Sequence, residues 1–289
     1  MCGTCGCSKT AKGTVTDLQS GQVLLRDGHA RPHGGEHHHH HGHDHSHDHD
    51  HHHHDRAHDH AQDHANHALE AAIMGKNDQL ARENREWLSE QNIIALNLVS
   101  SPGSGKTTLL ERTIRELYDS VPICVIEGDQ ETVNDAERIR ATGCRVVQIN
   151  TGTGCHLEAD MIAKGLRQLD PPRNSLAMIE NVGNLVCPAM FDLGERARVA
   201  ILSVTEGEDK PLKYPHMFRS SQVMLLNKVD LLPYLNFDVA RSIAAAREVN
   251  PDIHVIEVSA TTGAGMADWY AWIRQQLQIG QEAAAELHG

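Results

Sequence analysis

The chain has 289 residues, a formal net charge of -13 and 23 histidines. A chain of this length can hold one large domain or two small ones, but the residues up to about position 66 carry too few apolar side chains to bury a core. The acidic balance argues against binding to nucleic acid, because binding to phosphate backbones needs a basic surface.

The seven cysteines are odd in number and follow no spacing of a disulfide framework. The N-terminus has no apolar segment long enough for a signal peptide, and no apolar run approaches the length that spans a bilayer. The sequence therefore predicts a cytoplasmic protein with reduced thiols and no membrane segment.

The first zone, residues 1–12, is predicted to be a metal-binding peptide. Its opening MCGTCGC places Cys2, Cys5 and Cys7 in the order C-x-x-C-x-C, and an α-amino group can add a fourth donor. A thiolate-rich site of this kind holds a soft or borderline metal and releases protons on binding it. The alternative is a chance cluster of cysteines in a tail.

The second zone, residues 13–67, is predicted to be a disordered linker rich in histidine. Eighteen of the 23 histidines lie between positions 33 and 67, interleaved with aspartates, whereas a purification tag would be a pure histidine run at a terminus. The tract offers many weak, exchangeable imidazole sites that suit metal storage. The stretches GTVTD and GQVLLRDG can pair as a hairpin, but we favour a disordered spacer here.

The third zone, residues 68–289, is predicted to be the folded domain. Leu69, Ile73, Leu80 and Trp87 recur near helical spacing, which predicts one or two helices before the first strand. Apolar runs then alternate with helical patterns, as is typical of a parallel sheet covered on both faces. Such an α/β fold carries its chemistry at the carboxyl ends of its strands. The predicted strands are residues 93–99, 123–126, 146–149, 176–179, 199–204, 223–226 and 253–258.

The first of these strands ends in SSPGSGKTTLL, which matches the phosphate-loop pattern G-x-x-x-x-G-K-[ST] except that Ser100 replaces the first glycine. In this pattern backbone N–H groups face a phosphate, Lys106 neutralises phosphate charge and Thr107 offers its hydroxyl to Mg²⁺. The alternative, an ordinary glycine-rich turn, fits the strand before and the helical pattern after it less well. The predicted phosphate-binding residues are Gly103, Ser104, Gly105, Lys106, Thr107 and Thr108.

The sixth predicted strand ends in NKVD, which places Asn227, Lys228 and Asp230 beside the base of a nucleotide. A carboxylate that accepts hydrogen bonds from guanine is left unpaired when adenine is offered, so Asp230 favours GTP over ATP. The later VSATTG, with Ser259 and Ala260, resembles the loop whose backbone closes over guanine in GTPases.

Two acidic strand ends lie between these motifs, VIEGDQ with Asp129 and MIENVGNL with Glu180. Mg²⁺ prefers hard oxygen ligands, so a carboxylate near Thr107 is expected. The run from Glu180 to Gly183 has the form acid-x-x-Gly, whose glycine N–H can touch a γ-phosphate, and it is interpreted as a switch. The alternative is that both carboxylates cap the helices that follow. The predicted catalytic set is Lys106, Thr107, Asp129, Glu180 and Gly183.

Cys155 and His156 follow the third predicted strand, and Cys187 comes four residues after Gly183. Thiolate and imidazole together suit Zn²⁺ or square-planar Ni²⁺ better than Mg²⁺. One chain supplies at most three ligands, so we expect GTP to close a homodimer with the metal at its interface. The two remaining cysteines, Cys124 and Cys144, are interpreted as structural.

Taken together, these motifs resemble the HypB family, the nickel incorporation GTPases of [NiFe]-hydrogenase maturation. The resemblance covers most of the chain and is carried by MCGTCGC, the histidine-rich tract, SSPGSGKTT, GTGCHL, ENVGNLVCP, KYPHMF and NKVD. The related GTPase of urease maturation shares the phosphate loop and a histidine-rich tail, but it is shorter and lacks the terminal cysteine cluster.

The resemblance implies a P-loop GTPase domain over residues 68–289 that uses GTP, Mg²⁺, Ni²⁺ and Zn²⁺. It implies delivery of Ni²⁺ to the hydrogenase large-subunit precursor by a GTP-dependent homodimer, together with a partner nickel metallochaperone. Carried onto this chain, the N-terminal nickel site is Cys2, Cys5 and Cys7, and the nickel or zinc site of the GTPase domain is Cys155, His156 and Cys187. Two alternatives stay open, a nickel store with nucleotide-regulated dimerisation and the GTPase of urease maturation.

The residue that positions the hydrolytic water is not identified by the sequence. No obvious water-positioning glutamine or arginine finger is present, so slow GTP hydrolysis is the expectation. Lys164, Arg167 and Arg145 are candidates to stabilise phosphate charge across a dimer, and spacing does not choose among them.

Overall fold

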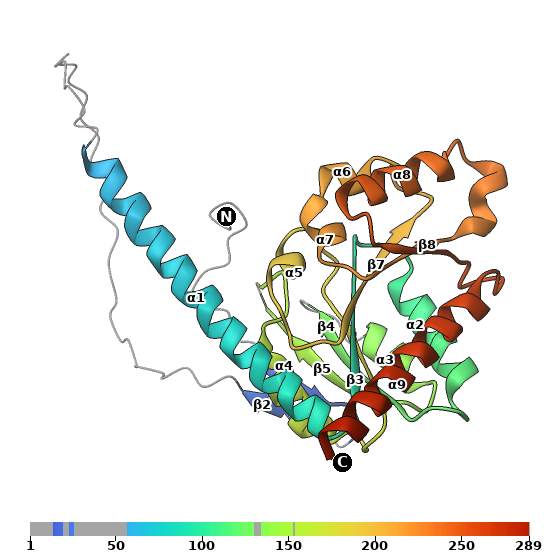
Figure 1. Cartoon of the computed structure of the whole chain (residues 1–289), viewed down its shortest axis with the longest axis horizontal. Helices are drawn as coiled ribbons and strands as arrows, with labels where there is room; N and C mark the ends of the chain where they lie inside the picture. Colours follow the sequence, from blue (N-terminus) through green and yellow to red (C-terminus); the bar gives the residue numbers. More distant parts are fainter. Residues whose placement is uncertain (1–13, 20–22, 26–56, 130–133, 153, 289) are drawn as a thin grey trace, which may run out of the picture. The chain divides into compact units, whose positions relative to one another are not determined.

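The computed structural model describes residues 14–19, 23–25, 57–129, 134–152 and 154–288 (Figure 1). Contacts divide the chain into two units, one formed by Met1–Arg26 with Lys76–Gly289 and the other by Asp27–Gly75. The first unit contains the sheet and every site residue described below. The described part of the second unit belongs to the first turns of one long helix, α1.

The described residues form one sheet with the strand order β2-β1-β5-β4-β6-β3-β7-β8-β9. From β5 to β9 all neighbouring strands pair in parallel. All seven strands predicted from apolar runs are confirmed. The strands are β1 (Thr14–Asp17), β2 (Val23–Leu25), β3 (Ile94–Ser100), β4 (Ile123–Asp129), β5 (Arg145–Asn150), β6 (Leu176–Glu180), β7 (Ala197–Ser203), β8 (Val223–Asn227) and β9 (His254–Glu257).

Helices alternate with the parallel strands along the chain, as the alternation of apolar and helical patterns predicts. They are α1 (Ala57–Glu90), α2 (Lys106–Leu117), α3 (Asn134–Arg140), α4 (Ala159–Leu169), α5 (Cys187–Met190), α6 (Lys210–Lys213), α7 (Pro215–Arg219), α8 (Val239–Val249), α9 (Met266–His288) and the 3₁₀ helix η1 (Val229–Tyr234).

The core lies on both faces of the sheet, because successive strand residues point to opposite faces. On one face the strands pack against α2, α3 and α9, with Leu110, Ile139 and Trp269 buried. On the other face α4 and the end of α1 cover one half, and α7 and α8 cover the other half. The P-loop NTPase fold class, a mostly parallel sheet flanked by helices, is confirmed.

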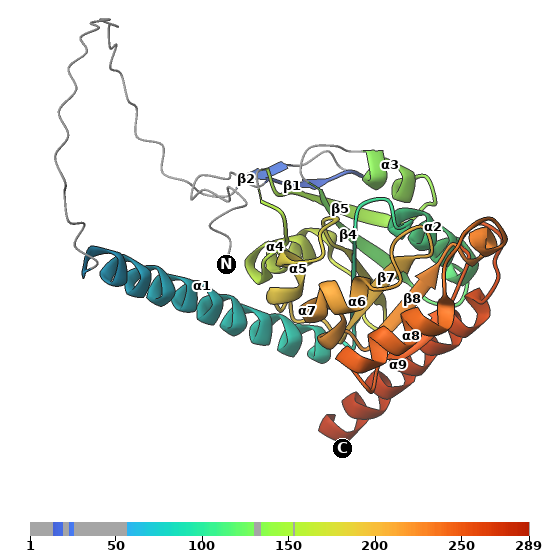
Figure 2. The same cartoon turned by 90° about the horizontal axis from the view of Figure 1, so that it is seen from above.

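The structure corrects the sequence interpretation of residues 14–17 and 23–25 as disordered spacer. β1 and β2 pair antiparallel, and β1 adds to the edge of the parallel sheet along β5, with Val15 opposite Ile149 (Figure 2). Val15 is buried at 5 % exposure within the same apolar cluster as Ile149. The short strand β1, which lies between β2 and β5, has a single buried residue, and one buried residue is a weak signal of a strand in a sequence.

The helix before β3 also differs from its prediction. α1 is one continuous helix, and it begins at Ala57 rather than near residue 68. The expected linker therefore overlaps the first turns of this helix. The remaining residues of the predicted linker, and Cys2, Cys5 and Cys7, lie outside the described part of the chain.

Candidate functional site

The phosphate loop joins β3 to α2 and is shaped by two glycines with positive φ. Gly103 has φ 75° and Gly105 has φ 91°, a region that favours glycine. A Cβ on Gly105 would also meet Asn227 Nδ2 at 2.7 Å. α2 begins at the next residue, and its N-cap makes no side-chain hydrogen bond. Its first N–H groups and helix dipole therefore form an arrangement that can bind a phosphate.

Lys106, Thr107 and Glu180 meet at the carboxyl edge of the sheet. Thr107 Oγ1 donates to Glu180 Oε1 at 2.7 Å, and Lys106 Nζ lies 3.5 Å from the same oxygen. Glu180 is 2 % exposed, and burial raises the pKa of its carboxyl, a shift that the Lys106 charge opposes. Its Oε2 makes no hydrogen bond with any described residue. A buried carboxylate beside a threonine hydroxyl is a set of hard oxygen donors that fits Mg²⁺.

A second buried carboxyl, which the sequence analysis missed, lies beside this cluster. Glu127 pairs with Glu180 in the register of β4 and β6 and is 2 % exposed. Burial, and then the neighbouring Glu180, raises the pKa of Glu127 to about 9. The signal was a glutamate inside the apolar run VIEGD. The predicted Asp129 ends β4, which β6 separates from β3, and its carbonyl accepts from Thr151 N at 2.9 Å.

The residues predicted to hold the base converge on the phosphate loop. Asn227 Nδ2 donates to Ser104 O at 2.9 Å, and Lys228 Nζ donates to Gly103 O at 2.7 Å. Asn227 therefore ties the end of β8 to the loop. On its other side Ala260 N donates to Asn227 Oδ1 at 3.4 Å.

The later loop is fixed by two further contacts. Ser259 Oγ donates to Asp230 Oδ1 at 2.5 Å, which orients the carboxylate predicted to read guanine. Arg112 of α2 donates to the carbonyls of Ala260 and Thr261, each at 3.1 Å. Sequence reasoning did not single out Arg112, because an arginine on an amphipathic helix carries no motif.

Glu206, also missed, supports the phosphate loop from the segment after β7. It accepts a hydrogen bond from Ser101 Oγ and another from Ser203 N at 3.0 Å. Lys210 Nζ lies 3.7 Å from the same carboxylate. The phosphate loop is therefore hydrogen-bonded to the segment after β7, through Glu206, as well as to the end of β8, through Asn227.

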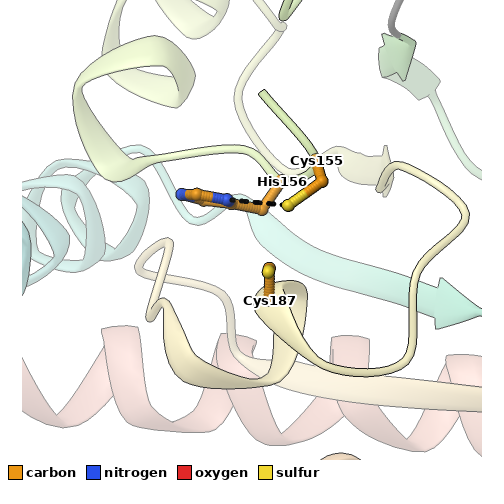
Figure 3. Close-up of side chains that lie close together, drawn as sticks. All are labelled: Cys155, His156 and Cys187. Atoms are coloured by element: carbon orange, nitrogen blue, oxygen red, sulfur yellow. Dashed lines mark hydrogen bonds between the residues drawn. The ribbon is translucent and has the colours of Figure 1, made fainter. Parts of the chain in front are cut away.

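Cys155, His156 and Cys187 come together as the sequence predicts. Their ligand atoms all lie within 4.8 Å of one another. Cys155 Sγ is 3.8 Å from His156 Nδ1, and Cys187 points toward both from the first turn of α5 (Figure 3). His156 and Cys187 are buried, whereas Cys155 is partly exposed. Two thiols and an imidazole this close together fit a thiophilic divalent metal such as Zn²⁺ or Ni²⁺.

The imidazole of His156 is held from two sides. It stacks on Phe191 with ring centroids 4.0 Å apart and an interplanar angle of 20°. Glu158 Oε1 lies 3.9 Å from His156 Nε2.

The segment that joins Glu180 to Cys187 connects the phosphate loop with the metal ligands. A Cβ on Gly183 would lie 3.3 Å from Pro102 of the phosphate loop. Asn181 Oδ1 accepts from Leu157 N at 3.4 Å. Asn184 Nδ2 donates to Cys155 O at 3.4 Å. Residues 180–187 therefore contact the phosphate loop through Glu180 and Gly183. They contact the segment of Cys155 and His156 through Asn181 and Asn184.

The other described cysteines do not join this cluster. Cys124 and Cys144 are buried, at 1 % and 3 % exposure. Burial raises the pKa of each thiol to about 12. The prediction that they are structural agrees with this burial, because a thiol must lose its proton to bind metal.

Two of the three basic candidates for charge stabilisation, Lys164 and Arg145, make their described contacts away from the phosphate loop. Lys164 pairs with Asp160 at 3.1 Å on α4. Arg145 begins β5, at the edge of the sheet opposite the site, and donates to Asp170 O at 2.9 Å. Their proposed role across a dimer stays a prediction.

Among the described residues, no helix is long and apolar enough to cross a membrane.

The phosphate loop joins a parallel strand to a helix and has a buried carboxylate beside it. NKVD lies at the end of β8, which β7 separates from the strand before the loop. This arrangement defines a P-loop nucleotide-binding protein. The family model for the CobW/HypB/UreG nucleotide-binding domain matches residues 94–257. The hydrogenase maturation factor HypB of Escherichia coli K12 is 62 % identical over 208 residues, covering 72 % of each chain. The chain belongs to the HypB hydrogenase maturation factors.

Two further comparisons agree with this assignment. The crystal structure of HypB from Helicobacter pylori in complex with nickel is 37 % identical, has a TM-score of 0.66 and is matched over 95 % of its length and 70 % of this chain. A protein named hydrogenase/urease maturation factor HypB, from Helicobacter hepaticus, is 44 % identical over 58 % of this chain and 71 % of its own.

Proposed function

We propose that the chain is a GTP-hydrolysing nickel metallochaperone that delivers Ni²⁺ to the large-subunit precursor of a [NiFe]-hydrogenase. The observation that carries this proposal is the continuity between Glu180, which contacts Lys106 and Thr107, and Cys187, seven residues later in the metal cluster. The nickel complex of the Helicobacter pylori relative supports the choice of metal. A nickel metallochaperone partner and a cytoplasmic location belong to the same proposal.

In this proposal the phosphate loop binds GTP through the N–H groups at the start of α2. Lys106 exchanges its contact with Glu180 for the β- and γ-phosphates, and Asp230 accepts from the guanine edge. The hydroxyl of Thr107 and the carboxylates of Glu180 and Asp129 are the oxygens that would hold Mg²⁺, which when bound neutralises charge on the phosphates. Hydrolysis is expected to be slow, since no described residue is an evident water-positioning glutamine.

Loss of the γ-phosphate affects the metal ligands through the switch segment, residues 180–187. Gly183, packed on Pro102, donates its N–H to the γ-phosphate and loses that contact on hydrolysis. The released segment carries Cys187 and, through Asn181, the backbone beside His156. Hydrolysis thereby moves ligands relative to one another and weakens the site.

A homodimer completes the metal site in this proposal. Cys155, His156 and Cys187 give three ligands, and a four-coordinate site needs one more. A second copy bound in the GTP state supplies it. Sedimentation with GDP and with a non-hydrolysable GTP analogue should give monomer and dimer respectively, with tighter Ni²⁺ or Zn²⁺ binding in the dimer. Equal affinities without dimerisation would contradict this step.

The test of the whole proposal is Ni²⁺ release to a competing chelator during GTP turnover. Faster release with GTP than with its non-hydrolysable analogue is expected in the intact chain. The Cys187→Ala variant should lose this difference, because its switch no longer carries a ligand. Cys144→Ser is a matched control, since Cys144 is buried away from the cluster. If the rate of Ni²⁺ release is the same with GTP and with its analogue in every variant, the chain is chiefly a nickel store.

A second candidate acceptor is the urease precursor. The Helicobacter hepaticus relative, whose name includes both hydrogenase and urease maturation, favours testing it. Nickel-loaded chain with GTP is mixed separately with apo-hydrogenase precursor and apo-urease, and nickel transfer to each is measured. We expect transfer to the hydrogenase precursor; transfer to urease alone would replace the proposed acceptor.

A further inference from the structure

We propose that Asn77 and Asn84 of α1 are positioning residues that hold the two metal-bearing segments, Cys155–His156 and Cys187, at ligand distance from each other. The inference rests on the proposed function in one respect, that this cluster binds metal. The two asparagines lie seven residues apart, two turns along one face of α1. Both are buried at 6 % exposure.

The first segment is held at Ala159, the first residue of α4 and three residues after His156. Ala159 N donates to Asn77 Oδ1 at 2.9 Å, and Ala159 O accepts from Asn84 Nδ2 at 2.8 Å. The N-cap of α4, Glu158, makes no side-chain cap hydrogen bond of its own. The capping role therefore passes to a residue of another helix, and α1 binds both backbone groups of Ala159.

The second segment is held just beyond α5. Asn77 Nδ2 donates to Asp192 O at 2.8 Å, and Asn84 Nδ2 donates to Leu193 O at 3.0 Å. Arg85 adds an ion pair to the Asp192 carboxylate at 2.8 Å. Asp192 directly follows Phe191, the residue that stacks on the His156 ring. Each asparagine thus bonds one group in each metal-bearing segment.

Close packing supports these hydrogen bonds. Gly194 has φ 89°, and a Cβ there would lie 2.6 Å from Ala81 O and 2.7 Å from Asn84 Cβ. α1 therefore rests directly on the backbone of the second segment. Leu88 shares an apolar cluster with Leu157 and Leu193, which belong to the two segments.

A carboxamide suits this role because it offers an acceptor and a donor in one rigid plane. Asn77 uses its oxygen on the first segment and its nitrogen on the second, so the two segments cannot separate without breaking a buried hydrogen bond. Partners that orient metal ligands typically change metal affinity by about 10–100-fold when they are lost. Asn77 and Asn84 act in this way through the backbone.

The test uses the full chain with Cys2→Ser, Cys5→Ser and Cys7→Ser as the parent, titrated with Ni²⁺ against a competing chelator. The ultraviolet charge-transfer band from thiolate to Ni²⁺ is the readout. It reports on Cys155 and Cys187, because imidazole sites of the histidine tract give no such band and the thiols with a pKa of about 12 stay protonated. A parent band that is absent, or that persists in Cys187→Ala, overturns the proposed function and the inference with it.

Two variants then test the inference itself. Asn77→Asp keeps an acceptor for Ala159 N but loses the donor to Asp192 O, so α4 stays capped while the link to the second segment breaks. Asn84→Ala removes both of its links. We expect each variant to bind Ni²⁺ at least ~10-fold more weakly than the parent, with a weaker band per bound metal.

Asn250→Ala is the matched control. Its Nδ2 also donates to main-chain carbonyls, those of Phe218 at 3.1 Å and Ser221 at 2.9 Å, but it lies at the end of α8 and these carbonyls belong to neither metal-bearing segment. It should lose thermal stability as the other two do and bind Ni²⁺ as the parent does. Parent-like affinity and band in Asn77→Asp and Asn84→Ala would overturn the inference, as would equal weakening in Asn250→Ala.

Discussion

At the scale of single residues, the phosphate loop accepts Ser100 in place of a glycine because this residue still belongs to the strand. Ser100 ends β3, is fully buried, and its Oγ donates to Ser101 O at 2.9 Å. Positive φ is needed only later, at Gly103 and Gly105, where glycine is present. The departure from the sequence pattern therefore leaves the phosphate-binding turn intact.

Asp230 is expected to decide between guanine and adenine. Its carboxylate is fixed by Ser259 Oγ, so replacing it removes the acceptor for guanine and leaves nothing to reject adenine. Asp230→Ala should reduce the preference for GTP over ATP by at least ~100-fold, measured by competition against a fluorescent GTP analogue. Ser259→Ala should have a smaller effect, because the carboxylate remains. An unchanged preference in Asp230→Ala would remove this residue from the base site.

Thiol reactivity should separate the metal-cluster cysteines from the structural ones. Burial raises the pKa of Cys124 and Cys144 to about 12, so near pH 8 only about 10⁻⁴ of either thiol is the reactive thiolate. Raising the pH toward 12 increases that fraction. We expect iodoacetamide at pH 8 to modify Cys155, which is partly exposed, and to spare those two, as read by peptide mass spectrometry. Bound Ni²⁺ should protect Cys155; modification of Cys124 first would contradict the burial.

At the scale of elements, the hairpin of β1 and β2 extends the parallel sheet by antiparallel pairing. Its contribution is carried by Val15, whose side chain joins the apolar cluster under β5 and α4. Its neighbour Thr16 alternates to the other face and is less buried.

Val15→Asp should destabilise the fold, because it places a charge in an apolar cluster. A cost of at least about 2 kcal/mol is expected, which corresponds to a loss of roughly 4 °C or more in Tm for a domain of this size. Thr16→Asp adds the same charge at a more exposed position and should change Tm much less. If calorimetry found equal small effects for both, the segment would be a spacer after all.

α1 is the element with the widest consequences for the site. Asn77 and Asn84 make it part of the structure around Cys155, His156 and Cys187, although it precedes the first parallel strand and contributes no residue to that cluster. A helix outside the nucleotide-binding motifs thereby links the segments that follow β5 and β6.

At the scale of the whole molecule, the histidine-rich tract and the phosphate loop lie in different stretches of the chain. Deleting residues 33–67 removes eighteen histidines and also the first turns of α1. The described hydrogen bonds of the phosphate loop come from Ser100 and later residues. We expect the deletion to lower the Ni²⁺ bound per chain while the rate of GTP hydrolysis stays unchanged, measured by equilibrium dialysis and phosphate release.

A variant with serine at the same eighteen histidines keeps the length of the chain and separates loss of imidazole from loss of helix. It should match the deletion in metal bound and the intact chain in GTP hydrolysis. Loss of GTP hydrolysis in either variant would assign the tract a part in the nucleotide cycle.

Much of the fold and of the site could be read from the sequence, because the relevant signals are local. The inner parallel strands, such as β3, β6 and β7, are buried on both faces and appear as continuous apolar runs. The phosphate loop and NKVD could each be placed at a strand end from the sequence, although the order of β3, β7 and β8 in the sheet could not. Since all parallel strands share one carboxyl edge, those motifs had to converge.

The sequence by itself predicted which residues would carry the chemistry: the phosphate loop, Asp230, Glu180 and the three candidate metal ligands. Their types and spacing follow from the chemistry of phosphate, guanine and metal. Tertiary structure alone decided what surrounds them. The pairing of β1 with β5, the elevated pKa of Glu127 and the contacts of Asn77 and Asn84 each depend on groups far apart in the chain. No local pattern specifies which distant backbone group a buried side chain will satisfy, because that choice is made only when the segments pack.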